Sequence, residues 1–289
     1  MDVETVAEKL FFCTAYITGS NDEEAWTGTG FMYGLPIAGK PGQAQYLVTN
    51  KHVVEDATLL EIRMIRATPD GKPMYGTPTT IGLRKFSEAF WLGHPDPKID
   101  VAVVPIGQGV QSTTEQGGGP YYAQFTPDKM LTKAGLAEFD ALEEVVLIGY
   151  PSGLFDSRNL IPVARRGLTA TPIRLDYEGE PAFLIDAAVF EGSSGSPVVA
   201  YGRGGYSTRG GGMVVGTERL VLLGILASGP SRKRVGDVIK LQKKDEELVA
   251  VFDELLSLGK VYKAWTIDEC VDAALAREGF TRGALPQTQ

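Results

Sequence analysis

The chain has 289 residues, of which 43% are hydrophobic, so it is long enough to bury one large core or two modest ones. Its formal net charge of −8 argues against a general nucleic-acid-binding protein, because binding to phosphates requires clustered cations. The sequence contains no run of about 18 apolar residues, so no membrane-spanning helix is expected. The 35 glycines and 17 prolines separate many short apolar runs, which favours an all-β architecture with a helical appendage.

The sequence also predicts a reducing environment and no bound metal. Cys13 and Cys270 are the only cysteines, too few for a disulfide framework. Residues 1–5 are acidic and lack the basic start and apolar centre of a signal peptide. We therefore expect a cytoplasmic protein with reduced thiols. Two separated histidines and two separated cysteines supply no ligand cluster, so neither a metal nor another cofactor is expected.

Six β-rich runs are expected in residues 1–110, where short apolar segments alternate with polar or Gly/Pro-rich turns. They cover residues 9–18, a run that starts at Gly28, and residues 46–50, 58–67, 77–86 and 101–105. Together they predict an N-terminal six-stranded β-barrel. Residues 111–143 follow as an expected linker, with a short helix over residues 127–134.

Two polar residues in this first part adjoin apolar strands. His52 follows the strand Tyr46-Leu47-Val48-Thr49-Asn50, and Asp100 opens the strand Val101-Ala102-Val103-Val104. A lone buried carboxylate is costly unless it is hydrogen-bonded or paired, so Asp100 is expected to have a partner. The other histidine, His94, lies in a Pro/Gly-rich loop that would orient a catalytic base poorly, and we expect it at the surface or at a cleft rim.

Residues 144–236 are expected to form a second, C-terminal β-barrel. Its strands are expected over residues 145–149, 160–171, 182–189, 197–201 and 220–226, with a glycine-rich surface loop over residues 201–212. Residues 237–289 are expected to be a helical extension. Apolar residues recur at helical spacing over residues 245–258, and Thr266-Ile267-Asp268-Glu269 is a capping box that predicts a second helix. These helices would pack on the second barrel or, alternatively, bind a partner.

The segment from Phe190 to Val199 predicts a strand, a tight turn and another strand. Its turn reads Gly192-Ser193-Ser194-Gly195-Ser196-Pro197. Such a turn presents a side chain and several backbone N–H groups to one point in space, as a serine nucleophile with an oxyanion hole requires. The alternative is an ordinary Ser/Gly surface loop, since both residues are common in turns.

The order His52, Asp100, Ser194 is that of the chymotrypsin triad. The matching motifs are Gly28-Thr29-Gly30-Phe31, Thr49-Asn50-Lys51-His52-Val53-Val54, Asp100-Val101-Ala102-Val103, Val146-Leu147-Ile148-Gly149-Tyr150-Pro151-Ser152-Gly153, Arg166-Gly167-Leu168-Thr169-Ala170 and the serine turn. On these motifs, which span most of the chain, it resembles trypsin/chymotrypsin-like serine peptidases. It is closest in style to the bacterial high-temperature-requirement branch and related intracellular branches.

The resemblance implies a fold and a set of site residues. The fold would be all-β, a double six-stranded antiparallel β-barrel with C-terminal helices, with His52 and Asp100 on the first barrel and Ser194 on the second. The family pattern selects Ser194 as nucleophile over Ser193 and Ser196, and gives the oxyanion hole to the backbone N–H groups of Gly192 and Ser194. The substrate pocket would be bounded by Ala188 and by the strand Leu226-Ala227-Ser228.

The expected function is therefore that of a serine endopeptidase acting on a protein or peptide substrate. Ala188 stands where a trypsin-like enzyme carries an aspartate, so we expect cleavage after small or medium apolar residues. A partner-binding or partner-triggered effector with low basal activity, and with an activating protein partner, is the alternative. An α/β-hydrolase is excluded, because that fold needs a histidine after the serine and no histidine follows Ser194.

Overall fold

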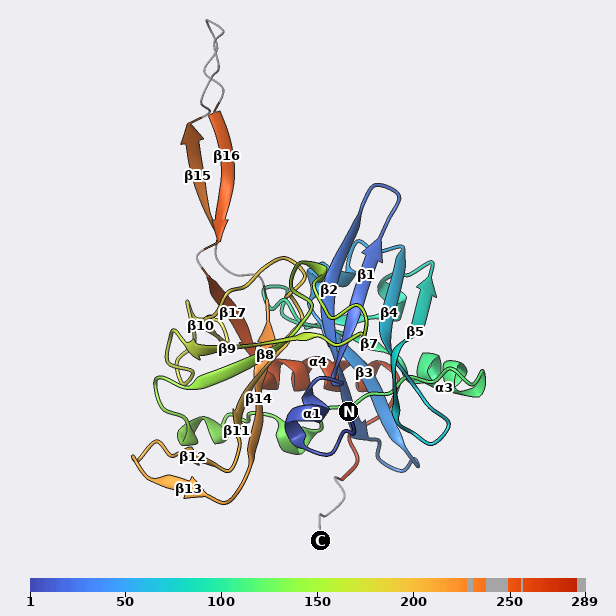
Figure 1. Cartoon of the computed structure of the whole chain (residues 1–289), viewed down its shortest axis with the longest axis horizontal. Coiled ribbons are helices and arrows are strands. Elements are labelled where there is room, and N and C mark those ends of the chain that lie inside the picture. Colours follow the sequence, from blue (N-terminus) through green and yellow to red (C-terminus); the bar gives the residue numbers. More distant parts are fainter. Residues whose placement is uncertain (228–230, 238–248, 256, 285–289) are drawn as a thin grey trace, which may run out of the picture.

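Two antiparallel β-sheets form the body of the protein, and the C-terminal helix lies behind them (Figure 1). The structure is a computed structural model that describes residues 1–227, 231–237, 249–255 and 257–284. Within these ranges no helix combines the length and the apolar character needed to cross a membrane. The mostly β architecture expected from the sequence is confirmed.

The first sheet is open and has seven strands in the order β5-β4-β1-β2-β3-β7-β6. The strands are β1 (Thr14–Ser20), β2 (Ala25–Pro36), β3 (Gln43–Thr49), β4 (Leu59–Ala67), β5 (Pro73–Arg84), β6 (Leu92–Gly93) and β7 (Ala102–Pro105). The prediction of a closed six-stranded barrel is therefore wrong for this half. The edge strand β6 has only two residues. Pro95 and Pro97 follow it and cannot donate ladder hydrogen bonds, so β6 cannot extend and close the sheet onto β5.

The second sheet is a closed six-stranded barrel in the order β10-β17-β14-β11-β8-β9, as predicted. The strands are β8 (Glu144–Gly149), β9 (Val163–Thr169), β10 (Ala182–Asp186), β11 (Pro197–Gly202), β14 (Arg219–Leu226) and β17 (Leu258–Lys263). The sequence located five of these strands. The sixth, β17, comes from the segment expected to be a helical extension, and it closes the barrel by pairing with both β10 and β14.

The remaining elements are short helices and two β-hairpins. The helices are α1 (Val6–Leu10), α2 (Lys51–Val54), α3 (Gly107–Glu115), α4 (Ala264–Arg277) and the 3₁₀ turns η1 (Glu88–Phe90), η2 (Pro127–Lys129), η3 (Gly135–Glu138) and η4 (Pro151–Gly153). The hairpins are β12 (Gly205–Ser207) with β13 (Met213–Val215), and β15 (Ser231–Asp237) with β16 (Val249–Leu255). Figure 1 shows the second hairpin projecting away from the barrel.

Three local predictions differ from the structure. Residues 127–134 hold one 3₁₀ turn, η2, instead of a continuous helix, and the expected loop over residues 201–212 contains strand β12. Residues 249–255 are a strand where the spacing predicts a helix, because they pair along their whole length with β15. The other residues of that predicted helix, except 257 and 258, lie outside the described ranges.

One C-terminal helix, α4, replaces the two expected in the part of the chain that is described. It begins at Ala264, directly after β17, so Thr266 lies inside the helix instead of capping it. The Thr266 hydroxyl donates to the Lys263 carbonyl at 2.8 Å. The buried face of α4 includes Ile267 and Val271, and it belongs to a core that contains residues of both sheets. Helix α4 therefore helps to fix the two sheets relative to each other.

Candidate active site

The first sheet brings His52 and Asp100 to the same place. Strands β3 and β7 are antiparallel neighbours, with Thr49 opposite Ala102. The chain therefore leaves β3 and enters β7 at the same end of the sheet. There Asn50 Nδ2 donates to the Asp100 carbonyl at 2.6 Å, which links the two segments directly.

The contact between His52 and Asp100 uses both carboxylate oxygens. The distance from His52 Nδ1 to Asp100 Oδ2 is 2.6 Å, and the backbone N–H of His52 donates to Oδ1 at 3.2 Å. Burial raises the pKa of Asp100, whereas hydrogen bonds from the ring and backbone of His52 lower it. The lowering effects together exceed the effect of burial, so the pKa of Asp100 lies below its usual value. An ionised Asp100 requires the proton on Nδ1, which leaves Nε2 of the half-exposed ring as a proton acceptor.

The serine turn places three hydroxyls in different environments. Ser193 and Ser196 are only 6% and 2% exposed, whereas Ser194 is partly exposed. Among the three, Ser194 is therefore the hydroxyl that a substrate can reach most easily. No hydrogen bond joins it to His52 among the contacts of the described residues. The structure thus brings His52 and Asp100 into contact, but it does not bond Ser194 to them.

Glycine shapes this turn at two positions with positive φ, +78° at Gly192 and +89° at Gly195. A Cβ atom at Gly195 would collide with the backbone oxygen of Thr29, so the turn packs directly on β2. The backbone N–H groups of Gly192 and Ser194 have no acceptor among the described residues, while that of Gly195 donates to the Leu226 carbonyl at 2.8 Å. Two free donors in this turn could bind a developing oxyanion.

Thr29, which sequence reasoning did not assign to the site, holds the turn against β2. Its hydroxyl donates to the Gly192 carbonyl at 2.8 Å and accepts from the Tyr150 N–H at 3.1 Å. Its own N–H donates to the Ser194 carbonyl at 2.9 Å. The residue is fully buried, so the two partners of its hydroxyl have no access to bulk water. The motif Gly28-Thr29-Gly30-Phe31 was a signal for this role.

Replacing Thr29 with valine should destabilise the fold and slow any reaction at Ser194. The substitution leaves the Gly192 carbonyl and the Tyr150 N–H without their partner, at a cost of about 1–3 kcal/mol per buried group. Urea unfolding measures the loss of free energy, and peptide turnover measures the loss of rate. Thr80→Val in the exposed part of β5 is the matched control and should change neither. An unchanged unfolding free energy in Thr29→Val would contradict this role.

The predicted substrate-binding residues are partly brought together. Ala188 and Leu226 line a cavity of about 10 Å³ beside the turn, but Ala188 is exposed whereas Leu226 is buried. Ala227 is buried and does not line this cavity, and Ser228 lies outside the described residues. Arg165 also lines the cavity. The sequence offered no signal for Arg165, because this cavity forms only once the strands of the barrel are assembled.

His94 does not serve as a second candidate base. It is 8% exposed, so the expectation of a surface position is wrong. Its Nδ1 accepts the Asp96 N–H at 3.0 Å, and its Nε2 lies 3.1 Å from Glu269 Oε2 on α4. Both ring nitrogens are therefore engaged: Nδ1 in a contact within the loop before Asp100, and Nε2 in a contact that attaches this loop to the C-terminal helix.

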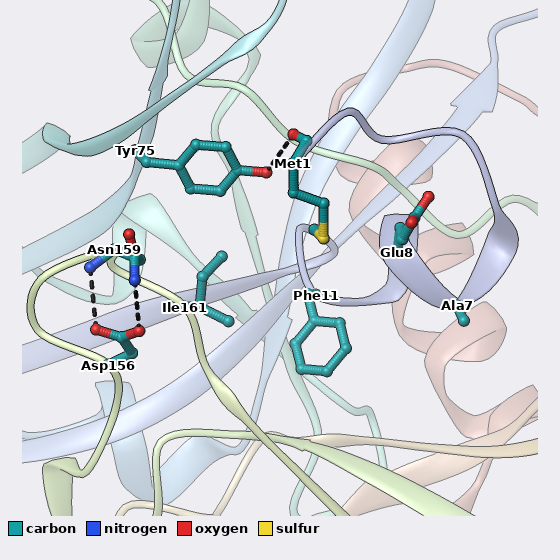
Figure 2. A pocket seen from close by; sticks show the side chains of 8 residues that line it. All are labelled: Met1, Ala7, Glu8, Phe11, Tyr75, Asp156, Asn159 and Ile161. Atoms are coloured by element: carbon teal, nitrogen blue, oxygen red, sulfur yellow. Dashed lines mark hydrogen bonds between the residues drawn. The ribbon is translucent and has the colours of Figure 1, made fainter.

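A cavity of about 420 Å³ lies elsewhere, beside the N-terminal segment (Figure 2). Phe11, Tyr75 and Ile161 provide apolar walls, and the Tyr75 hydroxyl donates to the Met1 carbonyl at 3.0 Å. None of the predicted site residues lines this cavity. This cavity is therefore not the candidate active site, although it is much larger than the cavity beside the serine turn.

The comparisons with solved structures match several proteases. An HtrA-type protease, AlgW with a tripeptide, matches at 16% identity and a TM-score of 0.50, covering 94% of this chain and 63% of the other. The chain thus spans less than two thirds of that protein's length. Rv3671c from M. tuberculosis, in an inactive form, matches at 17% identity and a TM-score of 0.44, covering 94% and 90%. A thermostable serine protease from an extremophilic microorganism matches at 12% identity and a TM-score of 0.47, covering 91% and 97%.

The comparison of sequences identifies the family. No curated protein matches the chain. The family model described as a trypsin-like peptidase domain matches residues 28–204, which include His52, Asp100 and Ser194. This range is more than half of the 289 residues. The chain therefore belongs to the trypsin-like peptidase family.

Proposed function

We propose that the protein is a serine endopeptidase that uses Ser194 as nucleophile, His52 as general base and Asp100 to orient the imidazole. The observation that carries this proposal is the pairing of His52 Nδ1 with Asp100 Oδ2 at 2.6 Å. A histidine bonded through Nδ1 to an ionised carboxylate has the tautomer that a general base needs. Partial exposure of Ser194, and burial of its two neighbouring hydroxyls, support its assignment as nucleophile.

In the proposed reaction, Ser194 Oγ attacks the peptide carbonyl while His52 Nε2 takes the hydroxyl proton. The carbonyl oxygen becomes an oxyanion, which the N–H groups of Gly192 and Ser194 bind. Removing one such donor typically lowers kcat by about 10²- to 10³-fold. His52 then gives the proton to the leaving amine. In the second half of the reaction water attacks the acyl carbonyl while His52 takes its proton, and His52 returns that proton to Ser194 Oγ as the carboxylic acid leaves. Asp100 stabilises the imidazolium formed in each half of the reaction.

The substrate is proposed to be a protein or peptide with a small or medium apolar residue before the scissile bond. Ala188 carries no charge that would bind a lysine or arginine side chain. Leu226 and Leu147 add apolar walls to the cavity beside the turn. The substrate backbone cannot pair at Leu226 itself, because β14 is bonded on both sides, to β11 and β17, and the Leu226 N–H and carbonyl already bind Ser196 and Gly195.

A partner-triggered effector with low basal activity is the second candidate, and one observation favours it. Ser194 makes no hydrogen bond to His52 among the described contacts, whereas His52 and Asp100 are already paired. An activating protein partner would then complete the triad by moving the serine turn. Full activity of the isolated chain toward peptides would count against this candidate.

Labelling with a fluorophosphonate tests the proposed function, because this small probe reacts with an activated serine and does not depend on the substrate sequence. Stoichiometric labelling of the folded chain at Ser194, located by peptide mass spectrometry, is the expected result. Ser194→Ala should abolish labelling, and Ser207→Ala, in the exposed hairpin strand β12, should leave it unchanged. A folded chain that remains unlabelled on its own would contradict the peptidase as proposed and favour the partner-triggered effector.

A further inference from the structure

Arg165 reaches the substrate cavity from strand β9. Burial alternates along this strand, with Val163 and Arg165 partly buried and Ala164 and Arg166 exposed. Val163 and Arg165 therefore lie on the same face. Both line the cavity that also includes Ser193 of the serine turn. The charged side chain thus lies in a cavity whose other walls are apolar residues, glycine and serine hydroxyls.

Two contacts hold the Arg165 guanidinium across this cavity. It donates to the backbone oxygen of Ala188, and its centre lies 4.7 Å from the centroid of the Phe190 ring. Gly167, on the same face of β9, allows the chain to approach. A Cβ atom there would collide with the Asp186 carbonyl, so only glycine lets the segment that carries Ala188 pass this close to the strand.

The space that remains is very small. The cavity volume of about 10 Å³ is close to the minimum that holds one water molecule. Leu147, paired directly opposite Arg165 on β8, closes another side. Arg165 therefore occupies space that a substrate side chain entering this cavity would need.

We infer that Arg165 determines specificity by narrowing the substrate pocket, so that only a small uncharged side chain such as alanine or serine is accepted before the scissile bond. This inference rests on the proposed peptidase function and narrows its substrate class. Leucine and phenylalanine are too large for the narrowed pocket. Lysine and arginine are excluded in addition by charge repulsion with the guanidinium.

An acidic substrate residue is the competing outcome, because Arg165 has no carboxylate partner among the described residues. The two contacts of its guanidinium argue against it. To bind a substrate carboxylate inside the pocket, Arg165 would have to leave the Ala188 carbonyl and the Phe190 ring, and it would lose a charge-assisted hydrogen bond and a cation–π contact. The experiment below separates selection by size from selection by charge.

The test compares kcat/KM of the full chain and its variants on peptides that differ only in the residue before the cleaved bond: Ala, Val, Leu, Phe, Glu or Lys. For the wild type we expect Ala to be cleaved at least about tenfold faster than Leu or Phe. Arg165→Ala should raise kcat/KM for Leu and Phe about tenfold or more, with Ala changing much less. Arg166→Ala is the matched control, because Arg166 is exposed on the opposite face and pairs with Glu144, and its profile should equal that of the wild type.

A second variant and an independent probe keep the result interpretable. Arg165→Gln retains a donor for the Ala188 carbonyl on a shorter side chain. Its kcat/KM for the Leu and Phe peptides should therefore lie between those of the wild type and Arg165→Ala, and it can be measured even where Arg165→Ala unfolds. A folded, fluorophosphonate-labelled Arg165 variant with an unchanged profile would overturn the inference. A wild-type preference for Glu that the Arg165 variants lose would also overturn it. A wild type that is neither labelled nor active would instead refute the proposed function on which the inference rests.

Discussion

Replacing His52 with alanine should lower kcat by about 10⁶-fold, and adding Ser194→Ala to that variant should lower it little further. The reason is that the two groups act as a unit in the proposed reaction. Without a base at position 52 the Ser194 hydroxyl stays a weak nucleophile, and without the hydroxyl the base has no proton to take. The residual rate in each variant would come from the N–H donors of the serine turn and from substrate binding.

The measurement is kcat for one peptide in the wild type, the two single variants and the double variant. His94→Asn is the control, because His94 is the other histidine and its ring makes only structural contacts in the described part of the chain. It should lower the free energy of unfolding through loss of the Glu269 contact while kcat stays near the wild-type value. Additive losses in the double variant would show that His52 and Ser194 act independently, and would contradict the proposed triad.

The fold was predictable where strands are short and bounded by turn residues. Five strands of the closed barrel follow from such runs, but β17 does not. Residues 258–263 follow a segment with helical spacing, and nothing local shows that they pair with β10 and β14. Residues 249–255 fail for a similar reason, because their structure is set by pairing with β15, a contact made outside their own sequence. The first sheet stays open for a local reason, because its edge strand β6 has only two residues before Pro95 and Pro97.

The candidate site was predictable where a charged residue adjoins an apolar strand, because a buried carboxylate needs a hydrogen-bonding or charged partner. Asp100 was expected to have a partner, and the pairing of β3 with β7 provides His52. Thr29 and Arg165 were not assigned, because their roles depend on contacts between segments far apart in the chain. The hydroxyl of Thr29 meets the Gly192 carbonyl 163 residues later, and Arg165 meets the Ala188 carbonyl 23 residues later. Contacts between residues so far apart along the chain leave no periodic signal in the sequence.

Replacing Asp100 with asparagine should lower kcat by about 10⁴-fold while KM changes little. Asp100 contacts His52 and not the proposed substrate, so its loss acts through the imidazole. An asparagine amide can donate to Nδ1, which places the ring proton on Nε2, where it can no longer accept the proton of Ser194. Peptide turnover gives kcat and KM separately. Asp56→Asn, the same change at an exposed residue near α2, is the matched control and should alter neither value.

The same variant tests the ionisation of Asp100 through stability. The pKa of Asp100 is lowered in the folded protein, so the ionised carboxylate stabilises the fold above its unfolded pKa of about 3.9, and this stabilisation is lost as pH falls through the lower folded pKa. Asp100→Asn removes the ionisable group. The difference in unfolding free energy between wild type and variant should therefore shrink as pH falls from above the unfolded pKa of Asp100 through its lower folded pKa. Urea unfolding at several pH values measures it. A constant difference would mean that the His52 contact does not hold Asp100 in its ionised form, and the tautomer on which the proposed base depends would lose its support.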